Sequence, residues 1–280
     1  MPKFNRILIM QNLYTVLQTA LCETNPVQKS ELTIDLFHQF HSGSLKLDKS
    51  TPALDIPIAG RPAKPELVAV NQVEKRKLTT AEGYAAMLHA ICHIEFNAIN
   101  LALDAAYRFR SLPDQFTADW LKVAKEEAEH FSLMRGRLLA HGFDYGDFSA
   151  HGHLWDMAYK TAFDPLLRMA LVPRVLEARG LDVTPAIRAK VEQRGDLETC
   201  AVLDIIYRDE VGHVKIGNHW YQYLCEQRGL EPIELFRNLL RRFDMFIFRG
   251  YVNLDAREQA GFSKFEMEML EHFEQSFQAA

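Results

Sequence analysis

Two segments of this 280-residue chain carry a glutamate followed three positions later by a histidine: Glu127-x-x-His130 and Glu210-x-x-His213. In an α-helix, residues three apart lie about 60° from each other on one face. Each pair can therefore direct a carboxylate and an imidazole at the same point in space. One such pair is weak evidence for a site, because helix surfaces rich in Glu and His produce the spacing by chance. Two pairs with matched partners restrict the fold far more.

Each pair is preceded by a single well-placed glutamate in the helical segment upstream. Glu95 lies 32 residues before Glu127, and Glu177 lies 33 residues before Glu210. Nearly equal separations are what two similar helical hairpins would produce. The sequence therefore predicts that four helices each contribute a carboxylate to one place, and that two of these helices add an imidazole.

The turns between these glutamates support the same geometry. The midpoint of the first hairpin falls in the turn sequence Ser-Leu-Pro-Asp at residues 111–114. About 16 residues in each direction, at about 1.5 Å per residue, place both glutamates about 24 Å from the turn. The midpoint of the second hairpin lies beside Gly195. This second match requires the helical segments on either side of residues 180–185 to be collinear, so the position of Glu177 depends on that condition.

Apolar residues recur at helical spacing along most of the chain, and no alternating strand pattern is visible. We therefore expect an all-α fold. Long helices are predicted from Thr79 or Thr80 to about 110, from about 114 to His141-Gly142, and from Gly195-Asp196 to Arg228-Gly229. Another helical region is predicted over about 155–180, with breaks at Pro165 and Pro173, and a short helix over Thr184-Pro185 to Arg194.

Shorter helical patterns flank this central part, two within residues 1–40 and two after residue 230, which include Phe246 and Phe273. Residues 41–78 are irregular and rich in proline, and we expect them to wrap over the core. The 13 residues of 142–154 are predicted to be a loop that crosses the bundle, since about 3.3 Å per residue gives sufficient length. The expected parts are 1–78 (N-terminal helices and wrapping segment), 79–229 (four-helix bundle) and 230–280 (C-terminal helices packed on the bundle).

The composition is that of an ordinary globular protein, with 48% hydrophobic and 25% charged residues. The net charge of −5 disfavours nonspecific binding to nucleic acid. No stretch approaches the length of a membrane span, about 20 consecutive apolar residues. The N-terminal sequence lacks the apolar core of a signal peptide. The four cysteines form no C-x-x-C pair, and we expect a reducing, cytoplasmic setting.

One glutamate from each of two helices, with Glu-x-x-His from each of the other two, is the ligand set of a dinuclear iron or manganese carboxylate centre. Carboxylates hold two cations close together and offset their charge, and one imidazole per ion suits iron or manganese. Magnesium or calcium sites have less use for imidazole, and a structural zinc site favours cysteine. We therefore predict two iron (or manganese) ions and six ligands: Glu95, Glu127, His130, Glu177, Glu210 and His213.

Residues beside these ligands are further candidates. Asp209 and Glu126 each precede a predicted glutamate ligand, from where a carboxylate can accept the free N–H of a histidine across the bundle. The alternative is that they are surface charges. Tyr207 and Cys92 each lie three positions before a predicted ligand and therefore on a ligand face. For these two residues, a redox role and simple packing beside the site both stay open.

Four other histidines have open roles. His89 and His93 share one face of the first long helix, and His93 is about 200° around the helix from Glu95, which favours a core position. His151 and His153 lie in the predicted crossover loop. There, surface exposure is the ordinary outcome, and a place at the entrance of a site is the alternative.

These motifs resemble those of the ferritin-like superfamily of non-haem di-iron carboxylate proteins. The match covers about residues 80–228 and is closest to an uncharacterised bacterial branch of that superfamily, a domain of unknown function with an N-terminal extension and extra C-terminal helices. The resemblance implies a four-helix bundle with one long crossover and a dinuclear centre held by the six residues above. It implies no substrate, because members range from ferroxidases and peroxidases to desaturases and hydroxylases.

The sequence favours an enzyme, an oxidoreductase in which a di-iron centre activates O2 or peroxide to oxidise or hydroxylate an organic substrate. The alternative is an iron-binding or ferroxidase-type stress protein without a dedicated organic substrate. The long terminal segments favour the enzyme, because a ferritin cage requires a compact bundle. The small-molecule substrate, the electron donor and the choice between iron and manganese are not predicted, and a homo-oligomer stays open.

Overall fold

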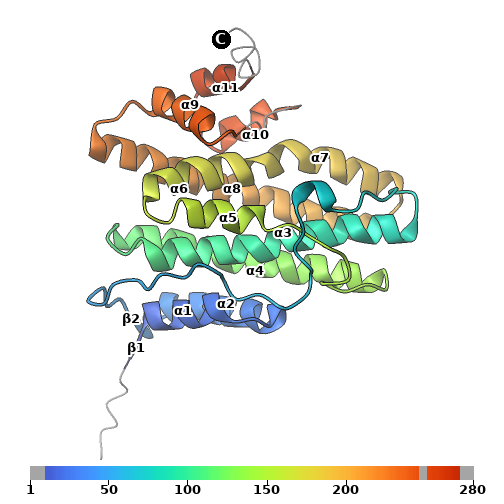
Figure 1. Cartoon of the computed structure of the whole chain (residues 1–280), viewed down its shortest axis with the longest axis horizontal. Helices are drawn as coiled ribbons and strands as arrows, with labels where there is room; N and C mark the ends of the chain where they lie inside the picture. The colour runs from blue at the N-terminus through green and yellow to red at the C-terminus, as the bar shows by residue number, and fades with distance from the viewer. Residues whose placement is uncertain (1–9, 246–250, 272–280) are drawn as a thin grey trace, which may run out of the picture.

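The computed structural model describes residues 10–245 and 251–271, and most of these residues are helical, which confirms the all-α class (Figure 1). The α-helices are α1 (Leu13–Cys22), α2 (Pro26–His41), α3 (Ala81–Arg108), α4 (Asp114–Ala140), α5 (His153–Lys160), α6 (Pro165–Leu171), α7 (Ala178–Gln193), α8 (Leu197–Arg228), α9 (Pro232–Arg242), α10 (Leu254–Gln259) and α11 (Lys264–Glu271). A 3-10 turn, η1 (Val70–Gln72), and a π-helical turn, η2 (Val172–Glu177), complete the helical elements of the described residues.

Strand structure within the described residues is short. β1 (Gln11–Asn12) pairs in parallel with β2 (Leu45–Lys46), and an isolated bridge joins Leu67 to Ala150. The bridge lies in the wrapping segment, where the sequence allows a short extended piece. The predicted helical residues Phe246 and Phe273 lie outside the described residues.

The long helices form two hairpins that lie side by side in Figure 1. α3 packs against α4, and α7 packs against α8. α4 also packs against α8, and this contact joins the hairpins. α6, η2 and α7 follow one another along α8, so together they act as one long helical segment.

Local capping sets the ends of these helices. Thr80 caps α3, and its hydroxyl accepts a hydrogen bond from a backbone N–H of the first turn. Of the two predicted starting residues, Thr79 and Thr80, Thr80 is therefore the one that caps the helix. Asp196 caps the start of α8, and α8 ends at Gly229, which has the left-handed φ of 62° that glycine adopts at little cost. These signals lie within a few residues of each helix end, which is why the sequence reveals them.

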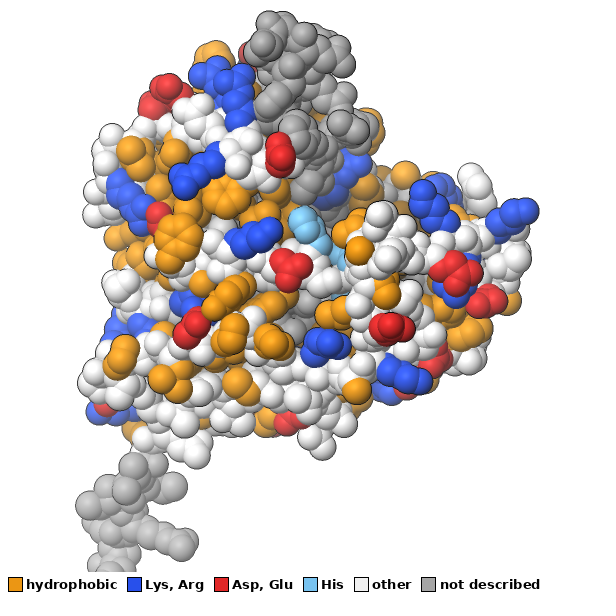
Figure 2. Space-filling model, viewed as in Figure 1, with side chains coloured by type: hydrophobic (Ala, Val, Ile, Leu, Met, Phe, Trp, Pro, Cys, Tyr) orange, Lys and Arg blue, Asp and Glu red, His pale blue; other side chains and the backbone are white. Residues whose placement is uncertain are grey.

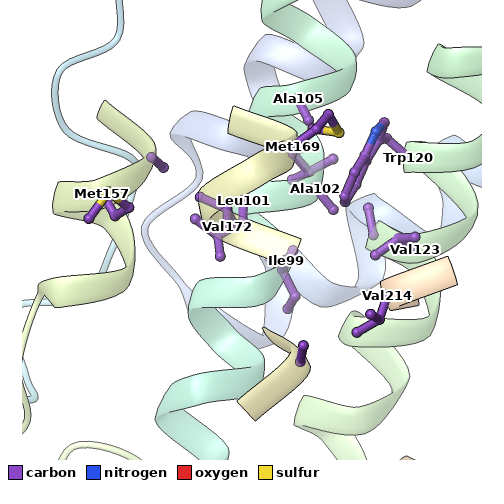
Figure 3. Close-up of a cluster of buried hydrophobic side chains, with 14 of the residues drawn as sticks. Ile99, Leu101, Ala102, Ala105, Trp120, Val123, Met157, Met169, Val172 and Val214 are labelled. Carbon is purple, nitrogen blue, oxygen red and sulfur yellow. The ribbon is translucent and has the colours of Figure 1, made fainter. Parts of the chain in front are cut away.

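Apolar side chains from both hairpins and from α5 form the core shown in Figure 3. Burial of one large aliphatic side chain stabilises a fold by about 1.5–3 kcal/mol, so this cluster holds the long helices in place. The alanines on α3 leave room for the neighbouring helices to approach. The labelled side chains are Ile99, Leu101, Ala102, Ala105, Trp120, Val123, Met157, Met169, Val172 and Val214.

The predicted helix break at residues 180–185 is wrong. α7 runs without interruption from Ala178 to Gln193, with Pro185 inside it. Proline has no N–H, so the carbonyl of Leu181 loses its usual helical donor. Asn253 Nδ2 donates to the Leu181 carbonyl at 3.1 Å. A side chain 72 residues away therefore supplies the hydrogen bond that the helix lacks at this carbonyl, and the local sequence does not reveal this contact.

The connection between the hairpins also differs from the prediction. The helical region expected over about 155–180 is divided at Pro165, which confirms one of the predicted breaks, since α5 is a separate helix and the long segment begins at Pro165. Asp164 accepts a hydrogen bond from the Leu166 N–H at 2.9 Å and caps α6, with proline in the first position. α5 packs against α3. The crossover is therefore longer than the predicted loop of 142–154 and contains a helix.

The terminal helices cover opposite sides of the two hairpins in Figure 1. α1 contacts α3, and α2 contacts α4. α9, α10 and α11 lie on the other side, where α9 contacts α6 and α10 contacts α7 and α8. α3 is long and apolar enough to cross a membrane, but 72% of its most apolar stretch is buried inside the protein, as in the core helix of a soluble domain.

Gly217→Ala is expected to destabilise the fold by about 1–3 kcal/mol. A Cβ atom at residue 217 of α8 would lie 2.4 Å from Cβ of Pro173 in η2, so the two elements would have to separate. Urea denaturation measures the loss. Gly212→Ala is the control, since no atom lies within 4 Å of its Cβ position and alanine favours the helix by about 1 kcal/mol. Equal effects of the two substitutions would contradict the close approach.

Candidate metal centre

The six predicted ligands come from the middle parts of the long helical segments. Glu95 lies on α3, Glu127 and His130 lie on α4, and Glu210 and His213 lie on α8. Glu177 ends η2, directly before α7. Because the residues of each pair are three apart, both side chains of a pair leave the helix on the same face. The packing of α4 against α3 and α8 turns these faces toward one another.

Four of these residues lie close enough together to hold a metal ion. One ligand atom from each of Glu95, Glu127, His130 and Glu210 lies within 4.8 Å of the others. His130 Nδ1 is 3.4 Å from Glu95 Oε2 and 3.4 Å from Glu127 Oε2. These side chains are almost completely shielded from solvent. The arrangement is therefore a compact, buried set of carboxylates around an imidazole.

His213 lies on the other side of Glu127. Its Nδ1 is 2.9 Å from Glu127 Oε1 and 3.9 Å from Glu210 Oε1. The two imidazole rings are 5.8 Å apart, centre to centre. Glu127 therefore lies between both histidines and offers one carboxylate oxygen to each.

Glu177 is outside the group of four, although it faces the same space. It lines a cavity together with Glu95 and Glu210. Burial, followed by the negative charges of Glu210 and Glu127, raises the pKa of Glu177 well above its usual value. The position of Glu177, at the edge of the cluster, is therefore compatible with the prediction that this residue is a metal ligand.

Seven polar atoms of this cluster have no hydrogen-bond partner among the described residues. Each of the six residues has at least one buried oxygen or nitrogen with no partner among the described residues, although burial of an unpaired polar group costs about 1–3 kcal/mol. Carboxylate oxygens and unprotonated imidazole nitrogens are also the atoms that bind metal ions. A cation would satisfy all of them together. The atoms are Glu95 Oε2, Glu127 Oε1, Glu127 Oε2, His130 Nδ1, Glu177 Oε2, Glu210 Oε2 and His213 Nδ1.

Two outer carboxylates orient the histidines. His130 Nε2 donates to Asp209 Oδ2 at 3.2 Å, and His213 Nε2 donates to Glu126 Oε2 at 2.9 Å. Each contact crosses between α4 and α8, in the manner that the sequence predicts for these carboxylates. Because Nε2 of each ring faces an outer carboxylate, Nδ1 faces the cluster, and a bound metal ion would take the place of any proton on it.

The charges in the cluster strongly affect one another. Burial raises the pKa of Glu95 to about 8, even though His130 favours the ionised form. Burial also opposes ionisation of Glu127, but His213 and His130 outweigh it and lower the pKa of Glu127. Burial disfavours the His130 imidazolium, yet its carboxylate neighbours raise the pKa of His130 to about 12. The carboxylates therefore require nearby positive charge, which is what a metal ion provides.

A cavity of about 540 Å³ opens against this cluster. Its volume is that of a typical small-molecule site. Glu95, Glu177 and Glu210 lie in its wall, and the rest of the wall comes from α3, η2, α7, α8, η1 and the crossover. Sequence reasoning missed the cavity. Its only signal was that apolar residues such as Ile91 and Ile206 share helix faces with the glutamates, and the same pattern is expected of any core.

Tyr207 and Cys92 make contacts beyond the cluster. The Tyr207 hydroxyl accepts a hydrogen bond from Asn253 Nδ2 at 2.9 Å, which joins α8 to the start of α10. Burial raises the pKa of Cys92 well above its usual value, and its thiol lies 4.0 Å from the carbonyl oxygen of Phe131. Both contacts are those of packing residues beside the site.

The four remaining histidines bind the crossover or line the cavity. His89 Nε2 accepts a hydrogen bond from the Gly146 N–H at 2.9 Å, and His93 Nε2 lies 3.0 Å from the His151 carbonyl oxygen. These two buried histidines therefore hold the crossover onto α3. His151 and His153 line the cavity, as expected of residues at the entrance of a site.

Glu126→Ala is expected to weaken metal binding by about 10–100-fold, because His213 would lose the acceptor that orients its ring. Competition between the protein and a chelator for Mn2+ measures the affinity. The matched control is Glu129→Ala on the same helix, since Glu129 pairs with Lys125 on the surface. Equal affinities of the two variants would show that the outer carboxylate has no effect on the centre.

Comparison with known proteins places the chain among relatives without an assigned activity. A family model described as "Protein of unknown function (DUF455)" matches residues 22–268. A protein of Haemophilus influenzae, described as "Uncharacterized protein", is 48% identical to this chain over 97% of the chain and 98% of that protein. No solved structure matches the chain. The extent of both matches shows that the chain belongs to the DUF455 family.

Proposed function

We propose that this protein is a ferritin-like dinuclear metal protein that oxidises an organic substrate. The observation that carries the proposal is the set of seven buried, unpartnered oxygen and nitrogen atoms on six residues. Hydrogen-bond donors from the protein would have satisfied these atoms if they served the fold alone. Their types, carboxylate oxygen and imidazole nitrogen, fit iron or manganese.

The donor set divides naturally between two ions. His130 faces one oxygen of Glu127 and Glu95, His213 faces the other oxygen of Glu127, and Glu210 lies near both histidines. Glu127 and Glu210 would therefore be the residues available to both ions, and Glu177 would add a carboxylate from η2. The helical segments that supply these residues are the two hairpins, α3 with α4 and α6–α7 with α8, joined by one long crossover. Ferritin-like dinuclear proteins have this distribution of ligands over four helices.

Two bound iron(II) ions would supply the electrons that reduce O2 or peroxide. The protein's own part is to hold and isolate the reaction. Asp209 and Glu126 keep the histidines oriented, and the buried cluster excludes bulk water. Hydroxylation with one O2 needs two electrons besides the two taken from the substrate, and an external reductant would have to restore these two after each turnover, whereas peroxide already carries them.

The cavity favours oxidation of an organic substrate over oxidation of iron alone. A ferrous ion is small and strongly hydrated, so a large apolar space offers it nothing. Here, about 540 Å³ of space meets three of the glutamates, and most of its wall is apolar. A pocket of this size and character is typical of an organic ligand site.

Metal analysis and oxygen uptake test the proposal. Protein purified from iron-supplemented cells is expected to contain about two iron ions per chain, as in other dinuclear carboxylate proteins. Fe2+ added to metal-free protein under air is expected to give one burst of oxygen uptake that ends when the site is filled. Sustained oxidation of excess Fe2+ would favour the iron-oxidising alternative. Wild-type protein that binds neither iron nor manganese would overturn the proposal.

A further inference from the structure

We propose that the cavity binds an aliphatic molecule with one polar end, held with its hydrocarbon part against the carboxylate cluster. This inference rests on the proposed function for its role as substrate, but the binding itself does not require the metals. It names the chemical class of the substrate, which neither the ligand set nor the family description indicates.

The wall of the cavity is aliphatic. Among the described side chains that line it, the apolar ones are valine, leucine, isoleucine and alanine, and none is aromatic. Planar ligands such as nucleobases are usually held between aromatic or guanidinium faces. Branched aliphatic walls instead suit a flexible hydrocarbon. The apolar lining residues are Val70, Ile91, Ile94, Ala98, Leu101, Leu154, Leu176, Val183, Ile187, Leu203 and Ile206.

Polar groups lie at three places in this wall, one of which is formed by Arg179 and Thr184 of α7. The carboxylates of Glu95, Glu177 and Glu210 form the part that meets the cluster. His151 and His153 come from the crossover, between α4 and α5. A ligand that enters past the crossover would therefore meet the histidines first. The apolar part of the cavity follows, and the carboxylate cluster lies beyond it.

His151 is the candidate partner for the polar end of the ligand. Its Nδ1 is buried and has no hydrogen-bond partner among the described residues. An unpaired buried nitrogen in an apolar wall is costly unless a ligand group satisfies it. A hydroxyl or carboxyl group of the ligand can do so, since imidazole both donates and accepts.

The outer rim of the cavity also favours an apolar ligand. Val70 is 61% exposed and Ile94 is 49% exposed, and both belong to the lining. Exposed apolar side chains at the mouth of a pocket are typical of a ligand path. Figure 2 draws the face of the molecule that is turned to the viewer in Figure 1. Histidine side chains are visible in a hollow near its centre, beside hydrophobic side chains.

Binding of cis-parinaric acid, a fatty acid that fluoresces in apolar surroundings, tests the inference with metal-free protein. Saturable binding of one molecule per chain is expected. Ile187→Trp and Thr184→Phe add volume at the wall formed by α7, and each is expected to weaken binding by about tenfold or more. His151→Phe keeps the ring shape and is expected to weaken binding by about tenfold, through loss of the hydrogen bond to the carboxyl group.

Leu197→Trp is the matched control, because Leu197 is 66% exposed and is not part of the cavity wall. It is expected to bind the probe like the wild type. Circular dichroism checks the fold of every variant. If Ile187→Trp does not fold, the comparison with the control relies on Thr184→Phe alone. Absence of saturable binding, or equal binding by the control and both filling variants, would overturn the inference.

Metal content of the same preparations separates this inference from the proposed function. A wild-type chain that holds two iron ions but binds no cis-parinaric acid would sink the aliphatic ligand and leave the dinuclear centre intact. A chain that binds the probe in the cavity but no iron or manganese would support the ligand class and overturn the oxidoreductase.

Discussion

Glu127→Ala is expected to reduce the metal content of the protein from about two ions per chain to almost none. Glu127 is completely buried, and its two oxygens face different histidines, His213 Nδ1 at 2.9 Å and His130 Nδ1 at 3.4 Å. Loss of any outer ligand would leave one half of the cluster complete. Loss of the shared carboxylate removes a ligand from both halves and leaves the two ions without the charge between them.

Plasma emission spectrometry of protein purified with iron measures this loss. Glu198→Ala is a suitable control, because Glu198 lies in the first turn of α8 and its side chain is 78% exposed. The control is expected to retain wild-type metal content. Retention of both ions in Glu127→Ala, with unchanged helix content, would show that the histidines and outer glutamates hold separate sites.

Arg257→Met is expected to destabilise the fold by about 3–5 kcal/mol, since it leaves a buried carboxylate without its main partner. Arg257 and Asp182 are both fully buried and form a two-point ion pair, with Nε 3.0 Å from Oδ1 and Nη2 2.8 Å from Oδ2. Arg179 also contacts Asp182, but its side chain is partly exposed. It therefore replaces only part of the lost charge.

A lower thermal midpoint, by roughly 10 °C, is the expected measurement, because about 1 kcal/mol corresponds to about 2–4 °C in a protein of this size. Arg188→Met on α7, the helix of Asp182, is the control, since Arg188 pairs with Asp204 at the surface and such pairs contribute little. A double variant with Asp182→Leu is expected to recover part of the loss, as the unpaired charge is then removed. Equal midpoints for the Arg257 and Arg188 variants would contradict the buried pair.

The sequence was sufficient where short-range rules decide the structure. The ends of α3, α4 and α8 follow from turn, cap and glycine signals within a few residues of each end. The spacing of Glu127 and His130, repeated at Glu210 and His213, required only the helical period. The number of residues between the glutamates also placed the second hairpin. The first arm of that hairpin, α6 with η2 and α7, has a different internal structure from the predicted one.

The sequence was not sufficient where distant residues decide the structure. Pro185 reads as a helix start, but Asn253 donates to the carbonyl that this proline leaves unpaired. Pro173 reads as a break, but it forms part of a π-helical turn that packs on Gly217. The cavity depends on which side chains fail to meet, and the periodicity of apolar residues does not encode that. The ligand class therefore emerges only from the assembled fold.

The π-helical turn η2 has a consequence for how this segment can vary. It joins α6, whose Arg168 pairs with Asp104 of α3, to α7, which begins beside Glu177. One more residue inserted here in α-helical geometry would rotate α6 against α7 by about 100°. Either the buried ion pair or the glutamate would then face away from its partner. Within this turn, the cluster fixes Glu177 and the close approach of Gly217 fixes Pro173, and an inserted residue is expected to cost more than exchange of the other side chains for ones of similar volume.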